Sequence, residues 1–143
     1  MKTFTRNIIM VAIMLVAMGT GSAVAQNLRD ASYNIVGKIA ANGTVRNSNY
    51  DPIGYFNNDG TIANAKGKTV GRIDAKMQIY NKAGERIGYI TADGTVNDGE
   101  SHLLGYIDVK SGKVTNPKGD VLGFANGISL QRVAAYYFFD FFD

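Results

Sequence analysis

The chain has 143 residues, of which 45% are hydrophobic and 19% are charged, and it contains 17 glycines and no cysteine. This composition fits one domain with a modest core, and it excludes disulfides as a source of stability. The net charge of +3 is not gathered into a Lys/Arg stripe, which argues against nucleic-acid binding.

The first 25 residues have the pattern of a secretory signal peptide. Lys2 and Arg6 precede an apolar run over residues 8–18, and Ala23-Val24-Ala25 forms a small-x-small cleavage site. The apolar run is shorter than the roughly 20 residues that a membrane span needs. We therefore expect cleavage near Ala25 and a mature protein of 118 residues that is secreted or periplasmic.

A glycine recurs along the rest of the chain at spacings of 17, 17, 17, 17 and 18 residues. These glycines are Gly37, Gly54, Gly71, Gly88, Gly105 and Gly123. Short β-branched or aromatic runs surround them, as in Ile87-Gly88-Tyr89-Ile90, and such runs predict strands. Tight Asn-Gly or Asp-Gly turns follow in three copies, and Asn-x-x-Gly turns follow the second strand in three copies. The pattern predicts an antiparallel meander of about ten short strands.

We predict an all-β fold in which five 17-residue glycine-centred hairpin repeats, over residues 35–127, form a closed flower-like ring. The half repeat Leu122-Gly123-Phe124 would complete the ring beside the first repeat. An open β-solenoid is the alternative, but turns that reverse the chain favour the ring. Residues 26–34 are expected to be an N-terminal extension. Distortion is expected in the third repeat, where Met77 replaces the turn glycine, and in the fifth repeat, which has one extra residue.

The repeated glycine indicates a steric requirement. Glycine inside a strand costs about 0.5–1 kcal/mol relative to alanine, and it often marks a bend or the close approach of another backbone. We expect the repeats to bring their glycines to a crowded common axis. Valine at Gly71 or Gly88 should therefore destabilise the fold several times more than a change at Lys82.

The repeats resemble the five-fold β-flower family of small exported bacterial proteins. The resemblance runs from about Ile35 to Phe124, and the segments V-G-K-I, I-G-Y-F, V-G-R-I, I-G-Y-I and L-G-Y-I carry it together with their turns. It implies a closed flower-like β fold and no assigned activity.

The C-terminal segment, residues 128–143, is rich in aromatic side chains. Six apolar residues fall at helical spacing, with Ser129 as a candidate N-cap. They are Leu130, Val133, Ala134, Tyr137, Phe138 and Phe141. One interpretation is that the segment docks on an open end of the ring. The other is that it contacts a membrane surface or a partner, because its opposite face is also apolar.

Candidate binding residues occupy the position one after the glycine. They are Tyr55, Tyr89, Tyr106 and Phe124, and Lys38 and Arg72 stand there in the other copies. Aromatic side chains on a rim could stack on sugar rings, although packing between hairpins is the more common role.

No pattern points to catalysis, a cofactor or a metal. His102, near Asp98 and Glu100, lacks the further ligands of a zinc site and is interpreted as part of an exposed loop. Residues 57–60 weakly resemble a calcium loop, but Lys68 stands where an EF-hand needs a glutamate. We therefore expect no enzymatic activity, no cofactor and no metal.

The functional prediction is a secreted, non-enzymatic structural or interaction module of the envelope or extracellular space. The alternative is a carbohydrate- or cell-wall-binding module that uses the repeated aromatic position. Its partner would be an envelope component, a glycan or a membrane surface.

Overall fold

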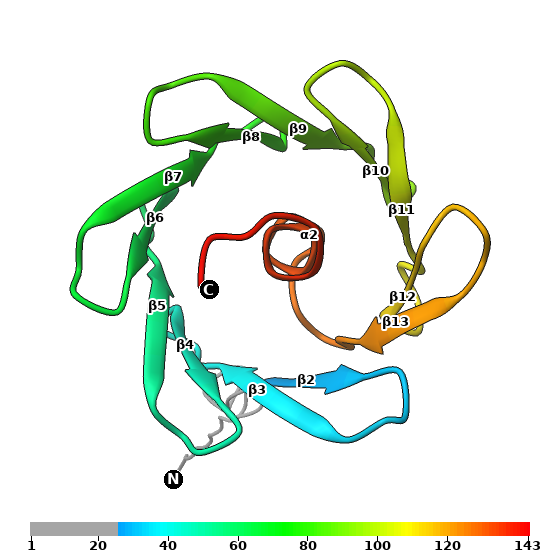
Figure 1. Cartoon of the computed structure of the whole chain (residues 1–143), viewed down its shortest axis with the longest axis horizontal. Helices are drawn as coiled ribbons and strands as arrows, with labels where there is room; N and C mark the ends of the chain where they lie inside the picture. Colours follow the sequence, from blue (N-terminus) through cyan, green and yellow to red (C-terminus); the bar gives the residue numbers. More distant parts are fainter. Residues whose placement is uncertain (1–25) are drawn as a thin grey trace, which may run out of the picture.

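The computed structural model describes residues 26–143, which form a closed ring of strands around one helix (Figure 1). The predicted signal peptide lies outside these residues. The strands are β2 (Gln26–Asp30), β3 (Ile35–Ile39), β4 (Thr44–Asn47), β5 (Pro52–Phe56), β6 (Thr61–Asn64), β7 (Thr69–Ile73), β8 (Gln78–Asn81), β9 (Arg86–Ile90), β10 (Thr95–Asp98), β11 (Leu103–Ile107), β12 (Lys113–Thr115) and β13 (Val121–Phe124). Consecutive strands pair antiparallel, and β13 pairs with β2. The all-β closed ring is thus confirmed, and the solenoid alternative is wrong.

Six hairpins, from β2–β3 to β12–β13, extend outward from the ring (Figure 1). The outer turn of each begins with an Asn or Asp whose side-chain oxygen accepts hydrogen bonds from the amides two and four residues later. These residues are Asp30, Asn47, Asn64, Asn81, Asp98 and Asn116. The recurring Asn or Asp is therefore explained by the turn that it closes.

The ring has six hairpins where the sequence predicted five repeats and a half, because each hairpin begins one strand before its glycine. The predicted N-terminal extension, residues 26–34, supplies the missing strand, since β2 pairs with both β3 and β13. Leu28 is paired with Gly37 as Val45 is paired with Gly54. The half repeat in β13 therefore closes the ring against β2 and not against the first glycine strand.

The third repeat keeps the turn geometry of the others, so the distortion expected there is not found, whereas the turn of the fifth repeat is one residue longer. Met77 has a φ of 63°, in the left-handed region where Gly43 has a φ of 92°. Its amide donates to the carbonyl of Asp74 at 3.2 Å. In the fifth repeat, the Gly112 amide donates to the Asp108 carbonyl at 2.8 Å across the longer turn. The pairing of the flanking strands fixes the turn even where the residue type is unfavourable.

The core lies between the ring and helix α2 (Leu130–Phe138), which is seen end-on at the centre of Figure 1. The first strand of every hairpin contributes one fully buried aliphatic side chain. These residues are Leu28, Val45, Ile62, Ile79, Val96 and Val114. The helix buries Val133, Ala134 and Ala135. The helical prediction for the C-terminal segment is confirmed, but the helix lies inside the ring and not on its end.

Candidate functional site

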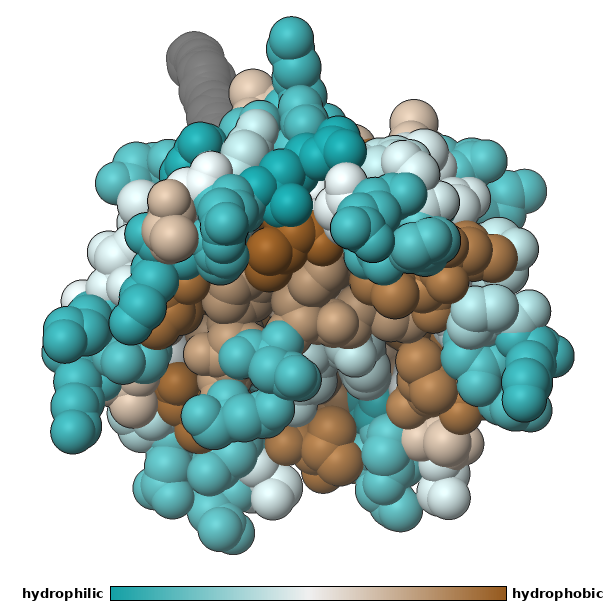
Figure 2. Space-filling view, turned by 45° about the horizontal axis from the view of Figure 1, so that its top comes forward, coloured by the Kyte–Doolittle hydropathy of each residue, from teal (hydrophilic) through white to brown (hydrophobic). Residues whose placement is uncertain are grey.

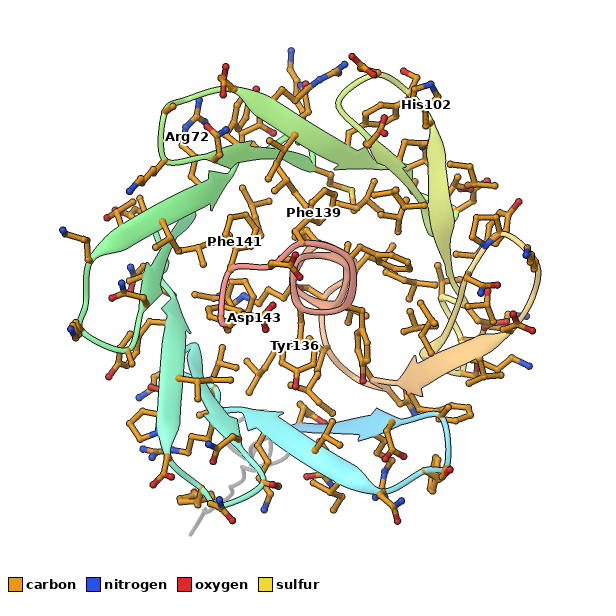
Figure 3. The ribbon with its side chains drawn as sticks, viewed as in Figure 1. Arg72, His102, Tyr136, Phe139, Phe141 and Asp143 are labelled. Atoms are coloured by element: carbon orange, nitrogen blue, oxygen red, sulfur yellow. The ribbon has the colours of Figure 1, made fainter. Side chains whose placement is uncertain are left out.

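Each of the six repeated glycines faces one aromatic ring of the C-terminal segment. We call residues 136–142 the aromatic plug. A Cβ atom added to five of these glycines would meet one of its rings, and one added to Gly37 would approach the hydroxyl oxygen of Tyr136 at 3.4 Å. The pairs are Gly37 with Tyr136, Gly54 with Phe142, Gly71 with Phe141, Gly88 with Phe139, Gly105 with Phe138 and Gly123 with Tyr137. Figure 3 shows Tyr136, Phe139 and Phe141 pointing from the centre toward different hairpins.

Two groups limit the space at five of these glycines, and at Gly37 the carbonyl oxygen of Arg46 alone does so, 2.7 Å from the added Cβ. A Cβ at Gly88 would lie 2.7 Å from Cε1 of Phe139 and 2.8 Å from the carbonyl oxygen of Asn97. Real Cβ atoms essentially never come within 3.0 Å of such atoms. The expected exclusion of larger side chains therefore holds, but its cause differs. At every glycine but Gly37 a plug ring and a neighbouring carbonyl fill the space, whereas the glycine spacing had predicted backbones that converge on an axis.

The ring covers the aromatic plug. Phe139 and Phe141 are each 9% exposed, and Phe142 packs edge-to-face on Phe56 with ring centroids 5.3 Å apart. Membrane contact through Phe139 and Phe141 would require the plug to leave the ring, whereas Phe142 is half-buried. Figure 2 shows apolar side chains toward the middle of one face, with hydrophilic side chains over the surrounding hairpins.

Within residues 26–143, no helix has the length and the apolar character needed to cross a membrane.

Tyr137 anchors the plug to the closing strands β2 and β13. Its hydroxyl donates to the carbonyl of Arg29 at 2.6 Å and to that of Phe124 at 3.3 Å. Burial is the main cause that raises the pKa of Tyr137 above its ordinary value of about 10. The folded state therefore disfavours the phenolate. The stability that the protonated Tyr137 hydroxyl contributes is complete below pH ~10, and it is lost as the pH rises toward the raised pKa of Tyr137.

We expect the free energy of unfolding to fall above pH ~10 and to fall less steeply in Tyr137→Phe. At pH ~7 this variant should lose about 1 kcal/mol, because the carbonyl of Arg29 loses its hydrogen-bond donor. Urea unfolding across neutral and alkaline pH measures both effects. Parallel alkaline slopes for the two proteins would contradict this interpretation.

The four aromatic residues proposed from the sequence lie on four different hairpins and do not form one site. Strand alternation places them on the face opposite the plug. Tyr106 is 43% exposed, and Tyr55 is half-buried. The Tyr89 hydroxyl donates to the Ser101 hydroxyl at 3.0 Å. Phe124 packs edge-to-face on Tyr33, with ring centroids 5.1 Å apart.

The structure assembles a second cluster that the sequence analysis missed. We call it the aromatic–arginine surface, and it consists of Arg29, Tyr33, Lys38, Arg46, Tyr50 and Phe124 on strands β13, β2, β3 and β4 and the outer turns of the first two hairpins. The Arg29 guanidinium lies 4.2 Å from the Tyr33 ring centroid, and that of Arg46 lies 4.7 Å from Tyr50. The Lys38 ammonium lies 5.5 Å from the Tyr50 centroid. Both pairs repeat as Arg-x-x-x-Tyr with a 17-residue offset, and this signal was available in the sequence.

His102 lies in the outer turn of hairpin β10–β11, at the rim in Figure 3. Its side chain is 72% exposed, and Nδ1 lies 3.2 Å from the Asp98 carboxylate. That carboxylate mainly closes the turn, because it accepts the amides of His102 and Glu100, and these bonds lower the pKa of Asp98. In residues 57–60, the Asp59 carboxylate accepts the Thr61 amide, as in an ordinary turn. Among the described residues, no group of three or more His, Cys, Asp or Glu side chains is placed to hold a metal.

A closed ring of antiparallel hairpins with an aromatic plug defines an all-β repeat protein. The family model described as "5-fold beta-flower protein" matches residues 20–142. The chain therefore belongs to the five-fold β-flower family, as the resemblance indicated. The match extends beyond the repeats and includes the plug. No curated protein and no solved structure matches the chain.

Proposed function

We propose that this β-flower protein is an exported, non-enzymatic interaction module of the envelope or extracellular space. The plug occupies the interior of the ring, so the outer faces of the hairpins are the surfaces that face a partner. The aromatic–arginine surface is the part of that exterior that best supports the proposal. Its three cations and three aromatic rings suit an acidic polysaccharide, in which sugar rings stack on tyrosines and carboxylates pair with guanidinium groups.

One observation carries this proposal. Tyr33 and Tyr50 have φ values of 71° and 68°, at a turn position where three other hairpins have Gly67, Gly84 and Gly119. A non-glycine residue in this conformation costs roughly 1–2 kcal/mol. Both tyrosines are nevertheless 58% exposed, so their rings are not required for the core. Conformational strain at an exposed aromatic residue is common at functional sites.

The structure modifies the carbohydrate-binding alternative. Phe124 belongs to the aromatic–arginine surface, whereas Tyr55, Tyr89 and Tyr106 lie on other hairpins. The proposed polysaccharide contact therefore depends on Tyr33 and Tyr50, and the repeated aromatic position contributes only through Phe124.

Replacing both tyrosines, as Tyr33→Gly with Tyr50→Gly, is expected to separate binding from stability. Glycine suits this turn, so the free energy of unfolding should stay within about 1 kcal/mol of the wild type or rise. Binding to polygalacturonate should fall by about 10-fold or more, because two stacking rings are lost. Isothermal titration calorimetry and urea unfolding measure the two quantities.

Ser101→Gly is the matched control, because Ser101 occupies the same turn position in hairpin β10–β11 with a φ of 68°. It should keep full binding. Dextran, a neutral polymer, should bind more weakly than polygalacturonate. Equal binding of polygalacturonate by the wild type and the double variant would reject the proposed surface.

A further inference from the structure

A cavity of about 480 Å³ lies between the start of α2 and the turns that follow β3, β5 and β7. Its wall includes Phe56, Asn57, Asn58, Asp74, Gln131 and Arg132. None of the aromatic–arginine surface lines it. Its volume lies in the range of small-molecule sites, which is roughly 300–1,000 Å³. The cavity is therefore a separate place at which this protein could hold a ligand.

Arg132 gives the cavity its chemistry. Among residues 26–143 the ion pairs are those of His102, so Arg132 has no carboxylate partner there. Its guanidinium is half-buried and lies 5.4 Å from the Phe56 ring centroid. Burial lowers the pKa of Arg132, which means that the surroundings disfavour the unpaired charge. An anion placed against the guanidinium would offset that cost and form a bidentate pair.

The other lining groups restrict the kind of anion. Asp74 is the only other charged side chain in the wall, so the cavity as a whole is neutral and suits a monoanion better than a dianionic phosphate. The Asp74 carboxylate already accepts the amides of Lys76 and Gln78 and the hydroxyl of Tyr80, which disfavours it as a partner for an ammonium group. Side-chain amides of Asn57, Asn58 and Gln131 offer donors and acceptors for hydroxyl groups.

We infer that this cavity binds a small hydroxylated monocarboxylate, of the sugar-acid class, with its carboxylate against Arg132. The hydroxyl groups then face the amide side chains of the wall. This inference goes beyond the proposed polysaccharide contact, because it concerns a monomeric ligand at a different place in the fold.

The test is calorimetric titration of the exported protein with sodium glucuronate. Glucose, inorganic phosphate and alanine serve as neutral, dianionic and zwitterionic comparisons. Arg132→Gln should weaken glucuronate binding by about 10-fold or more, because it removes a charge-assisted hydrogen-bonded pair. Arg86→Gln is the matched control, since Arg86 also lies over an aromatic ring, that of Tyr89 at 5.0 Å, but outside the cavity.

Asn58→Ala changes the part of the cavity wall that the turn after β5 supplies and leaves the helix unaltered, so it tests the site even if Arg132→Gln fails to fold. Melting temperatures establish that each variant is folded. Glucuronate binding that is weakened by both cavity variants and kept by Arg86→Gln supports the inference. It is overturned if the folded wild type does not bind glucuronate, if the folded cavity variants bind it as well as the wild type, or if phosphate, glucose or alanine binds more tightly. The double variant with Tyr33→Gly and Tyr50→Gly should bind glucuronate as the wild type does. That result would separate this inference from the polysaccharide proposal.

Discussion

Deleting Ala135–Asp143 is expected to abolish the cooperative fold of the ring. The deletion removes all six aromatic rings that face the strand glycines. Truncating one buried phenylalanine costs about 3–5 kcal/mol. Phe139 and Phe141 are buried and the other four rings are half-buried, so their combined loss reaches the total stability of a typical domain, which is about 5–15 kcal/mol. Near-UV circular dichroism and urea unfolding should show no fixed aromatic packing and no cooperative transition.

A peptide of residues 128–143, added in trans, should restore part of the near-UV signal if the plug is what the empty ring lacks. Asp140→Ala, an exposed position within the plug, is the control and should unfold like the wild type. A truncated protein that stays soluble, unfolds cooperatively and no longer sediments with membranes would instead favour membrane attachment through the plug.

Valine at Gly71 or Gly88 is expected to cost at least about 4 kcal/mol, a loss that few single substitutions cause. At Gly71 a Cβ would lie 2.6 Å from the carbonyl oxygen of Tyr80 and 3.0 Å from Cζ of Phe141. Neither group is free to move, because one belongs to a paired strand and the other to the packed plug. Urea unfolding measures the loss directly, and a variant without a cooperative transition also meets the expectation.

Two changes nearby serve as controls for that steric effect. Gly84→Ala should cost only the roughly 1–2 kcal/mol of its left-handed backbone, because its φ is 85° and an added Cβ would meet nothing within 4 Å. Lys82→Val, at an exposed turn position, should change stability by about 0.5 kcal/mol or less. Comparable losses at Gly88, Gly84 and Lys82 would show that the strand glycines are not sterically required.

The period and the turns were predictable because they are local properties of the chain. The 17-residue spacing of Gly37, Gly54 and Gly71 indicated the repeat, and the Asp-Gly and Asn-x-x-Gly sequences indicated reversals. Anchoring the repeat on glycine placed its boundary one strand too late. Leu28 stands 17 residues before Val45. The 17-residue spacing of these aliphatic residues therefore reaches back to the first hairpin.

The partner of the glycines was not predicted, because it depends on contacts between residues far apart in the chain. The plug changes from helix to extended backbone after Phe138, so no single periodicity describes how its rings are distributed. Phe139 therefore reaches Gly88, while Phe141, two residues later, reaches Gly71. One signal was available: residues 136–142 contain six aromatic side chains, which equals the number of repeated glycines.

The candidate surface was missed for a related reason. The position after the repeated glycine is aromatic in four copies and suggested a binding site, but periodic positions on a ring lie on separate hairpins. The Arg-x-x-x-Tyr repeat is visible in the sequence, but the contact between each guanidinium and its tyrosine ring also depends on a left-handed turn residue, which a non-glycine residue does not indicate.

A double-mutant cycle on Gly88 and Phe139 tests most directly whether each strand glycine makes room for one plug ring. Urea unfolding of Gly88→Ala, Phe139→Leu and the combined variant should show a combined loss smaller than the sum of the single losses by about 0.5–3 kcal/mol, because the smaller side chain leaves space for the methyl group. The mismatched cycle of Gly88→Ala with Phe142→Leu should be additive to within about 0.5 kcal/mol, since Phe142 faces Gly54. Additive losses in the matched cycle, or equal coupling in both cycles, would contradict the pairing of glycines with rings.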